Sequence, residues 1–277
     1  MEKEHTRMAL LSVNEATTFR WSLEDDLAHY AAAGIPALGV WRHKLSDYGQ
    51  TRGIELISAS GLKVSHLFWA GGFTGSDGRS FRASIDDATE ALNTAAAIGA
   101  GVLLVYSGAR AGHTHNHARR LLRDALRELA PAAAQRGIVL ALEPMHPDCA
   151  GSFTFLTSVD QTLEVLESVG SPHVKMVFDT YHLGQDDALL DQMPQIAPHV
   201  ALVQLGDARR PPDKEQNRCL LGEGYIPIAR IVGQLRDLGY DGYFDVELLG
   251  EEIERFDYPQ LLEHAKQAFD QLLGSRV

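Results

Sequence analysis

Cysteine is scarce in this chain, and its scarcity excludes one class of protein. The 277 residues contain two cysteines, Cys149 and Cys219, and neither belongs to a CxxC motif. Two distant thiols cannot form the disulfide framework of a small secreted domain, and they suit a reducing compartment. We therefore expect two incidental thiols and a cytoplasmic protein.

Long apolar runs and excess positive charge are also missing. No apolar stretch reaches the roughly 18 residues of a membrane-spanning helix, and the short apolar run near the N-terminus predicts a first strand rather than a signal or transit peptide. The formal net charge of −12 would repel a nucleic-acid backbone. The densest basic cluster has helical spacing between leucines, typical of a solvated helix face; it comprises Arg119, Arg120, Arg123 and Arg127. We expect neither a membrane nor a nucleic acid as partner.

Short apolar, β-prone runs recur eight times, separated by helical patterns. Such runs are typical of parallel strands buried on both faces, and the chain length is ordinary for a barrel of eight βα units, which has roughly 250 residues. A doubly wound sheet would need a glycine-rich turn after an early strand, and the first turn, TTFRWS, has no glycine. We predict a single α/β domain over residues 1–277, a (β/α)8 TIM barrel, with strands at 8–13, 36–41, 63–69, 101–106, 138–143, 174–179, 200–205 and 243–248.

Capping and stop residues bound the helices between these strands. We expect helices from Ser22 to Gly34, from Ser84 to Gly99, over 117–137, from Ser158 to Gly170, from Pro227 to Gly239 and from Pro259 to Gly274. Two long loops, 70–81 and 206–225, follow the third and seventh strands. Barrels place their active sites at this end, and loops of this length are usually functional.

Four oxygen-bearing side chains close the last four strand-like runs: Glu143, Asp179, Gln204 and Glu247. In a parallel barrel these strand ends converge on one face, where unpaired carboxylates repel one another and are costly to desolvate. A divalent cation resolves that cost. Oxygen donors favour hard cations, so we predict Mn²⁺ or Mg²⁺, with Co²⁺ and Zn²⁺ as alternatives. Glu143 and Glu247 are also placed for proton transfer.

The segments LEPMHP, FDTYHLG, QLGDARR and GYFDVELLG occur in an order that resembles the xylose isomerase-like TIM-barrel superfamily of sugar isomerases and epimerases. The resemblance covers essentially the whole chain and implies that the four side chains named above are the metal ligands. Epimerases of this superfamily commonly carry histidine at the third ligand position, and Gln204 resembles the dehydratase-like branch instead. The resemblance also implies a homo-oligomer, since these barrels are often dimers or tetramers.

The same resemblance implies substrate contacts. His182, three residues after Asp179, matches a histidine that binds substrate oxygens, and Arg210 matches a substrate-binding arginine, with Arg209 as the fallback because the pair makes the register ambiguous. Cys149 stands where epimerase-like members often have a glutamate. His146 either replaces that contact or orients Glu143.

Further candidates lie at the ends of the earlier strands. His66 and Trp69 close the third run and Trp41 closes the second, where an indole face would suit the C–H face of a sugar ring, with a core aromatic as the alternative. His113, in the cluster GHTHNH after the fourth strand, is a further candidate for a substrate contact. Gly222-Glu-Gly224 is a weak phosphate candidate that better fits a tight turn, which favours a non-phosphorylated sugar or keto-polyol as the small-molecule substrate.

Together these features predict proton transfer through a metal-stabilised enediolate, giving epimerisation or isomerisation of a sugar or keto-polyol. A lyase on the same scaffold, of the inosose dehydratase type, shares the first step and remains open. An endonuclease IV-like nuclease would need more histidine ligands than this chain offers. At the end of the fourth strand, Tyr106-Ser-Gly stands where one of those histidines would be. A non-catalytic barrel would have lost one or two ligands, and all four are present.

Overall fold

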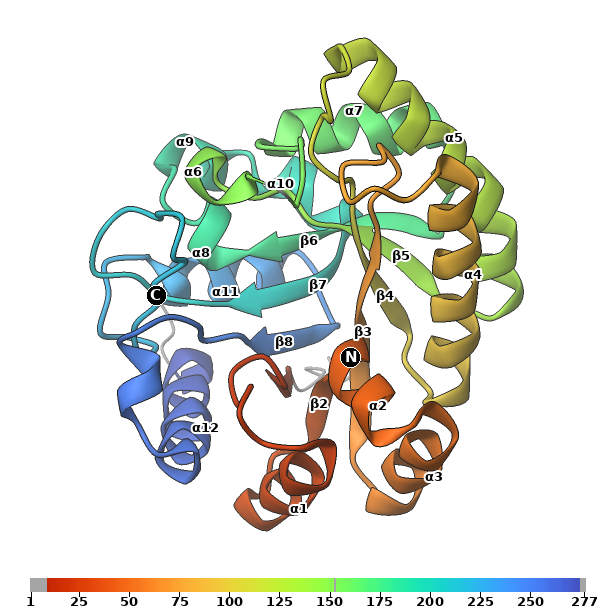
Figure 1. The fold of residues 1–277 in the computed structure, drawn as a ribbon. Coiled ribbons are helices and arrows are strands. Elements are labelled where there is room, and N and C mark those ends of the chain that lie inside the picture. Colours follow the sequence, from red (N-terminus) through yellow and green to blue (C-terminus); the bar gives the residue numbers. More distant parts are fainter. Residues whose placement is uncertain (1–8, 152, 275–277) are drawn as a thin grey trace, which may run out of the picture.

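The computed structural model describes residues 9–151 and 153–274. Eight parallel strands close into one barrel in the order β1 to β8, with β1 paired to β8 (Figure 1). The predicted TIM barrel is confirmed, and closure excludes the doubly wound sheet. The strands are β1 (Leu10–Asn14), β2 (Ala37–Trp41), β3 (Lys63–Gly71), β4 (Val102–Tyr106), β5 (Val139–Leu142), β6 (Val174–Asp179), β7 (Val200–Leu205) and β8 (Tyr243–Val246). Met8, the first residue of the first predicted strand, lies outside the described residues.

Helices surround the barrel and return the chain from the end of one strand to the start of the next. The helices that pack around it are α1 (Leu23–Ala33), α2 (Arg42–Tyr48), α3 (Gln50–Ser60), α4 (Phe81–Ala97), α5 (His115–Gln135), α7 (Val159–Val169), α11 (Ile228–Asp237) and α12 (Tyr258–Gly274). Shorter pieces are α6 (Pro147–Ala150), α8 (Thr180–Leu183), α9 (Asp187–Asp191), α10 (Met193–Ile196), η1 (Ala197–His199) and η2 (Ile253–Arg255). No helix of the described residues is long and apolar enough to cross a membrane.

Local sequence signals account for most helix boundaries. Ser22 caps α1 in a reciprocal capping box with Asp25, and Gly34 ends the helix in the left-handed conformation, as predicted. The start predicted at Ser84 is wrong: Ser80 caps α4 four residues earlier, and the Ser84 hydroxyl is buried and donates to the Gly72 carbonyl. Helices α2 and α3 were not predicted.

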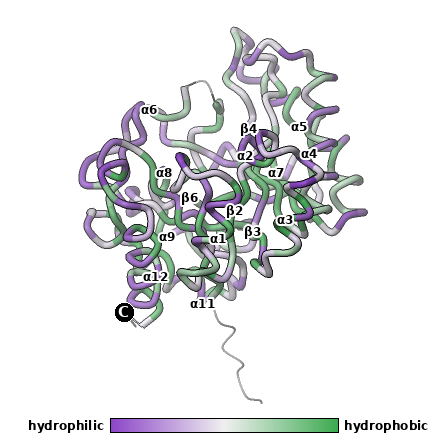
Figure 2. Tube along the Cα trace, turned by 60° about the horizontal axis from the view of Figure 1, so that its bottom comes forward, coloured by the Kyte–Doolittle hydropathy of each residue, from purple (hydrophilic) through white to green (hydrophobic). Residues whose placement is uncertain are grey.

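The strands separate two apolar clusters. A large cluster joins the outward-facing strand residues to the helices. In the trace coloured by hydropathy, hydrophobic segments of strands and helices lie toward the interior (Figure 2). A small cluster fills the barrel interior with Leu104, Ala141, Val177 and Leu202, one from each of β4 to β7. Because side chains alternate along a strand, the residues two positions later also face inward, at the carboxyl ends of the strands. Those residues are Glu143, directly after β5, Asp179 on β6 and Gln204 on β7.

Candidate metal centre at the barrel mouth

The structure brings the four predicted ligands together at the barrel mouth. Asp179 and Gln204 are direct partners across β6 and β7, and Gln204 is the partner of Asp245, two residues before Glu247. All four side chains are buried. The Gln204 Nε2 atom donates to Glu247 Oε2 at 3.0 Å, which orients the glutamine with its Oε1 atom away from that carboxylate. The strand geometry therefore produces the convergence that the sequence predicts.

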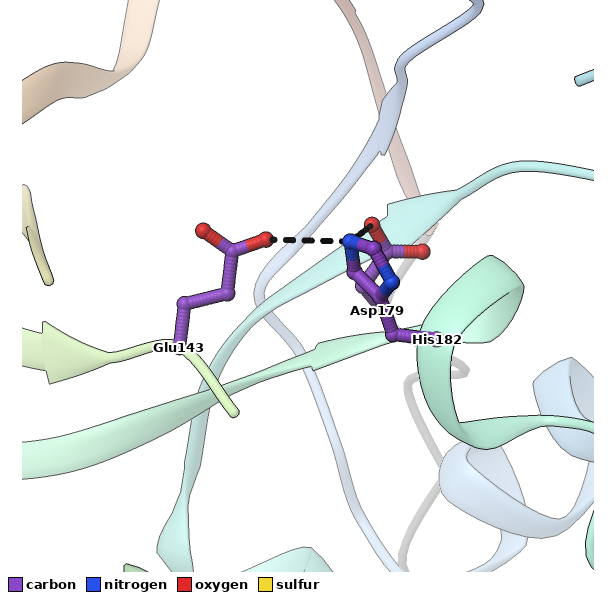
Figure 3. Close-up of side chains that lie close together, drawn as sticks. All are labelled: Glu143, Asp179 and His182. Carbon is purple, nitrogen blue, oxygen red and sulfur yellow. Dashed lines mark ion pairs between the residues drawn. The ribbon is translucent and has the colours of Figure 1, made fainter. Parts of the chain in front are cut away.

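Helix α8 adds His182 to this group. Asp179 caps the helix, because its Oδ1 atom accepts from the Tyr181 N–H at 2.7 Å, and one short turn then places the imidazole over the carboxylates. The His182 Nε2 atom lies 3.8 Å from Asp179 Oδ2 and 4.0 Å from Glu143 Oε1 (Figure 3). One ligand atom from each of these three residues lies within 4.8 Å of the others. This spacing suits a single bound ion.

Burial sets the electrostatics of the site. Burial, with the nearby charges of Glu247 and Asp179, raises the pKa of Glu143 well above its ordinary value. Burial also raises the pKa of Glu247 to about 7, against the lowering effect of the Arg218 guanidinium. The His182 pKa falls to about 4, chiefly through burial, so the imidazole is neutral at pH 7. A neutral imidazole beside crowded carboxyls is the form that binds a metal.

Unpaired polar atoms test whether a cation fits here. Among the described residues, no hydrogen-bond partner exists for the buried His182 Nδ1 and Nε2 atoms or for Gln204 Oε1. Each such orphan costs about 1–3 kcal/mol if left unsatisfied, and several at one point indicate a missing partner. Carboxylate, amide and imidazole donors together suit Mn²⁺, Zn²⁺ and related divalent ions. The residues present fit a divalent cation.

Arg218 is the residue that sequence reasoning missed. Its Nη2 atom lies 2.7 Å from Asp179 Oδ2 and 3.3 Å from Glu247 Oε2, and its guanidinium stacks over the Tyr181 ring at 4.7 Å. The side chain is 1% exposed. The residues beside it in the sequence, Asn217 and Cys219, carry no signal for this placement, because an arginine is buried only where acids from other segments meet it.

Arg210 and Arg209 are held elsewhere. The Arg210 side chain is 62% exposed and pairs with Asp213 at 3.3 Å, while Arg209 pairs with Glu223 and, at 3.1 Å, with Glu252. The four predicted ligands, Glu143, Asp179, Gln204 and Glu247, are called the quartet below. In this structure the guanidinium that contacts the quartet belongs to Arg218. The predicted substrate contact of Arg210 or Arg209 would require those surface pairs to break.

His146 and Cys149 flank the site through α6. His146 caps this helix, with its Nδ1 atom accepting from the Asp148 N–H at 3.3 Å. The Cys149 thiol donates to the Asp213 carbonyl at 3.1 Å, and burial raises its pKa to about 12. Cys149 thus stays a thiol and anchors the loop after β7.

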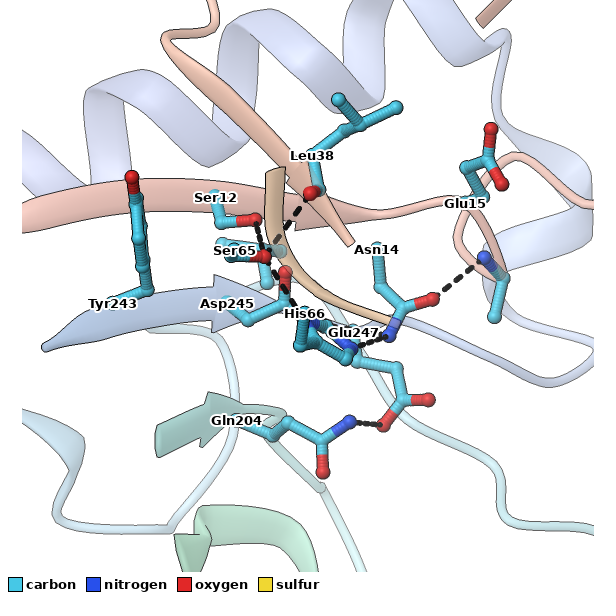
Figure 4. A network of polar contacts seen from close by, with 12 residues as sticks. Ser12, Asn14, Glu15, Leu38, Ser65, His66, Gln204, Tyr243, Asp245 and Glu247 are labelled. Carbon is cyan, nitrogen blue, oxygen red and sulfur yellow. Dashed lines mark hydrogen bonds and ion pairs between the residues drawn. The ribbon is translucent and has the colours of Figure 1, made fainter. Parts of the chain in front are cut away.

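His66 belongs to a buried polar network that lies next to Glu247 and Gln204 (Figure 4). Its Nδ1 atom is 3.0 Å from Ser65 Oγ and its Nε2 atom is 3.4 Å from Asn14 Nδ2, which also donates to Asp245 Oδ2 at 3.1 Å. Burial lowers its pKa to about 3. The ring fills space that exists because Gly39 has no side chain: a Cβ there would lie 2.2 Å from His66 Cε1. This setting favours a structural role over the predicted substrate contact.

Aromatic rings form an arc on the β2–β4 side of the mouth, across the barrel from the acids. The Phe68 ring lies 6.2 Å from Trp41 and 5.2 Å from Trp69, and Trp69 lies 4.4 Å from Tyr106 and 5.3 Å from Phe153. Trp41 and Trp69 are half-buried and Phe153 is 37% exposed. The arc leaves aromatic surface open beside the site.

His113 engages the loop after β3 rather than the quartet. Its Nε2 atom donates to the Thr74 carbonyl at 3.2 Å, and its ring stacks on His117 at 4.6 Å. Thr114 caps α5.

The glycines of Gly222-Glu-Gly224 are engaged as well. The Asp207 Oδ2 atom accepts from the Gly222 and Gly224 N–H groups at 2.9 and 3.0 Å. These donors form a tight turn and are not free for a phosphate.

Comparison with known proteins agrees with this geometry. The family described as xylose isomerase-like TIM barrel matches residues 27–271. The D-psicose 3-epimerase of Enterocloster bolteae is 29% identical over half of this chain and 46% of its own length, and the inosose isomerase of Bacillus subtilis is 23% identical over 52% of each chain. The chain thus spans about half the length of these curated relatives.

Solved structures share the fold over nearly the whole chain. A protein of Sinorhizobium meliloti has a TM-score of 0.86 at 24% identity, covering 95% of this chain and 98% of its own. The IOLI protein with a bound zinc atom has a TM-score of 0.82 at 20% identity, covering 96% and 98%. An L-ribulose 3-epimerase reaches 0.78 at 20% identity, covering 96% and 95%.

Proposed function

The chain belongs to the xylose isomerase-like TIM barrel family, and from that premise we propose that it is a divalent-metal-dependent epimerase or isomerase of a keto-sugar or keto-polyol. One observation carries the proposal: buried carboxyl, amide and imidazole groups converge at the mouth and leave several ligand atoms unpaired. Glu143, Asp179, Gln204 and Glu247 would hold the cation, with His182 beside them. Mn²⁺ and Mg²⁺ are the first ions to test.

The bound cation would polarise a substrate carbonyl and offset the negative charge that develops when a neighbouring C–H bond loses its proton. Glu247 is suited to take and return that proton, because its pKa of about 7 lies near neutral pH. Glu143 would serve the opposite side of the substrate, where its raised pKa favours the protonated form. Return of the proton to the opposite face of the same carbon gives an epimer, and return to the next carbon gives an isomer.

Arg218 and the aromatic arc support the substrate class. The Arg218 Nε and Nη1 atoms are buried without a hydrogen-bond partner among the described residues, so they are available to hydroxyl or carbonyl oxygens of a bound sugar, the role that the sequence suggested for Arg210. Trp41 and Trp69 offer ring faces to C–H groups opposite the acids. His146 would contact the substrate from α6, and His113 would contact it only if its bond to Thr74 opened.

A dehydratase acting on a cyclic keto-polyol is the second candidate. The amide of Gln204 donates to Glu247, and glutamine at this third ligand position resembles the dehydratase-like branch of the superfamily. Incubation with inososes and with open-chain ketohexoses separates the two: an absorbing, dehydrated product indicates the lyase, and an isomeric product of unchanged mass indicates the epimerase or isomerase.

Exchange of the substrate α-proton with solvent tests the shared first step. In D₂O with Mn²⁺ and the substrate that the panel identifies, Glu143→Gln and Glu247→Gln should each lower deuterium incorporation at least about a hundredfold, the usual size of a lost general base. Glutamine keeps the size of the side chain, so the circular dichroism spectrum should not change. Glu128→Gln, on the surface of α5, is the control. Deuterium incorporation at the wild-type rate in both site variants would refute the proton-transfer roles.

A further inference from the structure

The Arg218 guanidinium contacts the oxygen atoms that the proposed cation would use. Its Nη2 atom reaches Asp179 Oδ2, the oxygen that also lies 3.8 Å from His182 Nε2, and Glu247 Oε2, the oxygen that accepts from Gln204. A cation placed among Glu143, Asp179 and His182 would therefore share at least one oxygen with Arg218. Two positive groups on one carboxylate repel each other.

The structure holds the arginine in this place by more than charge. The backbone N–H of Arg218 donates to the Leu249 carbonyl at 2.9 Å, and the guanidinium lies against the Tyr181 ring. Gly206 makes room for the side chain, since a Cβ there would lie 2.8 Å from Arg218 Nε and 3.0 Å from its Cδ atom. These contacts direct the guanidinium toward the carboxylates of Asp179, at the end of β6, and Glu247, directly after β8.

The three buried acids of the quartet need a positive charge beside them. Glu143, Asp179 and Glu247 are all at most 4% exposed, and burying three carboxyls without compensation is far more costly than burying them with a cation. Arg218 is buried with them, and an arginine guanidinium stays charged in a folded protein. Among the described residues, it is the one basic side chain that forms ion pairs with any of these three acids, apart from neutral His182.

We propose that Arg218 is an internal counter-cation that competes with the divalent metal for Asp179 and Glu247 and so sets the metal affinity of the site. The inference rests on the proposed function in that it assumes a cation at the quartet. It assigns Arg218 two opposite effects: it stabilises the acids when they hold no metal, and it weakens their hold on the metal. Removing its charge should separate these effects in one protein.

The test is divalent-ion binding without substrate, by titration calorimetry with MnCl₂ on chelator-stripped protein, together with thermal unfolding in EDTA and in Mn²⁺. Arg218→Met, which keeps a long side chain without charge, should bind Mn²⁺ at least about tenfold more tightly and unfold at a lower temperature than wild type in EDTA. The difference in unfolding temperature between EDTA and Mn²⁺ should be larger in this variant. Arg218→Lys, which keeps the charge, should stay within a few fold of wild type.

The control is Arg209→Met, which removes an exposed arginine from the same loop and should change neither quantity. Equal or weaker Mn²⁺ binding by Arg218→Met, with wild type binding normally, would overturn the competition and leave the proposed function standing. If wild type binds no divalent ion, the metal-dependent function falls together with this inference. If Arg218→Lys binds Mn²⁺ as tightly as Arg218→Met, packing rather than charge causes the effect and the proposal is overturned.

A measurement on the wild-type protein covers the case in which Arg218→Met does not fold. The guanidinium Nε–H resonance of Arg218, assigned by its loss in Arg218→Lys, should shift in a saturable way as diamagnetic Mg²⁺ is added, because the ion and the guanidinium share Asp179. The corresponding resonance of Arg209 should not move. An Arg218 resonance that stays in place at saturating Mg²⁺ would contradict the proposal.

Discussion

Replacing Asp207 by alanine should loosen the loop that carries Arg218. The Asp207 carboxylate is 1% exposed and accepts four backbone N–H groups: those of Ala208 at 2.8 Å, Gly222 at 2.9 Å, Gly224 at 3.0 Å and Ile226 at 3.3 Å. One buried side chain thus joins the two ends of the segment 206–226. The loop has no long helix or strand of its own to order it.

The cost follows from where these donors lie. Ala208 and Ile226 are buried, so their N–H groups would lose their partner without access to water, at about 1–3 kcal/mol each. Gly222 and Gly224 are more exposed, so water can replace the carboxylate there. We expect Asp207→Ala to lower the free energy of unfolding by about 3 kcal/mol. Asp207→Asn keeps one acceptor oxygen and should lose roughly half of that.

Urea denaturation followed by far-ultraviolet circular dichroism measures this change, and limited trypsin digestion reports on the loop, since Arg209 and Lys214 lie within it and neither precedes a proline. Cleavage in the loop should speed up in Asp207→Ala. Asp213→Ala, which removes a more exposed acid of the same loop, should cost at most about 0.5 kcal/mol. A free energy of unfolding for Asp207→Ala within about 0.5 kcal/mol of wild type would refute the assigned role.

Two further predictions concern the buried polar groups near β1 to β3. Gly39→Ala should cost about 2 kcal/mol, because its Cβ would collide with the His66 ring; in a His66→Ala background that cost should vanish, and equal costs in both backgrounds, measured by urea denaturation, would show that the ring is not the obstacle. Glu15 is buried and close to Asp26, and burial followed by that charge raises its pKa to about 8. The folded state therefore keeps a proton that the unfolded state loses, so the contribution of Glu15 to stability is fully present below about pH 4.5 and is lost as the pH rises to about 8. Glu15→Gln, which keeps an acceptor for the Trp41 N–H, should reduce this loss by on the order of 2 kcal/mol; an unchanged slope of unfolding free energy against pH would count against the raised pKa.

Much of the fold could be predicted because the signals are local. Each strand is a short β-branched or apolar run, and observed strand bounds differ from the predicted ones by at most two residues at either end within the described part of the chain. Helix starts were less certain where two capping residues compete: Ser80 and Ser84 can both cap a helix, and packing of Ser84 under the loop after β3 decided between them. Helices α2 and α3 have no side-chain cap at their N-termini and were missed.

The sequence by itself determined which side chains close the last four strands, because inward and outward positions alternate regularly and parallel strands end on one face. The choice among the arginines of the loop after β7 depended on tertiary structure. The family resemblance pointed to Arg210, but Asp207 folds the loop back on itself and so brings Arg218 to the acids. His66 likewise ends buried because Gly39, on the neighbouring strand, leaves room for its ring. Contacts between segments far apart in the chain decide such placements, and no local pattern encodes them.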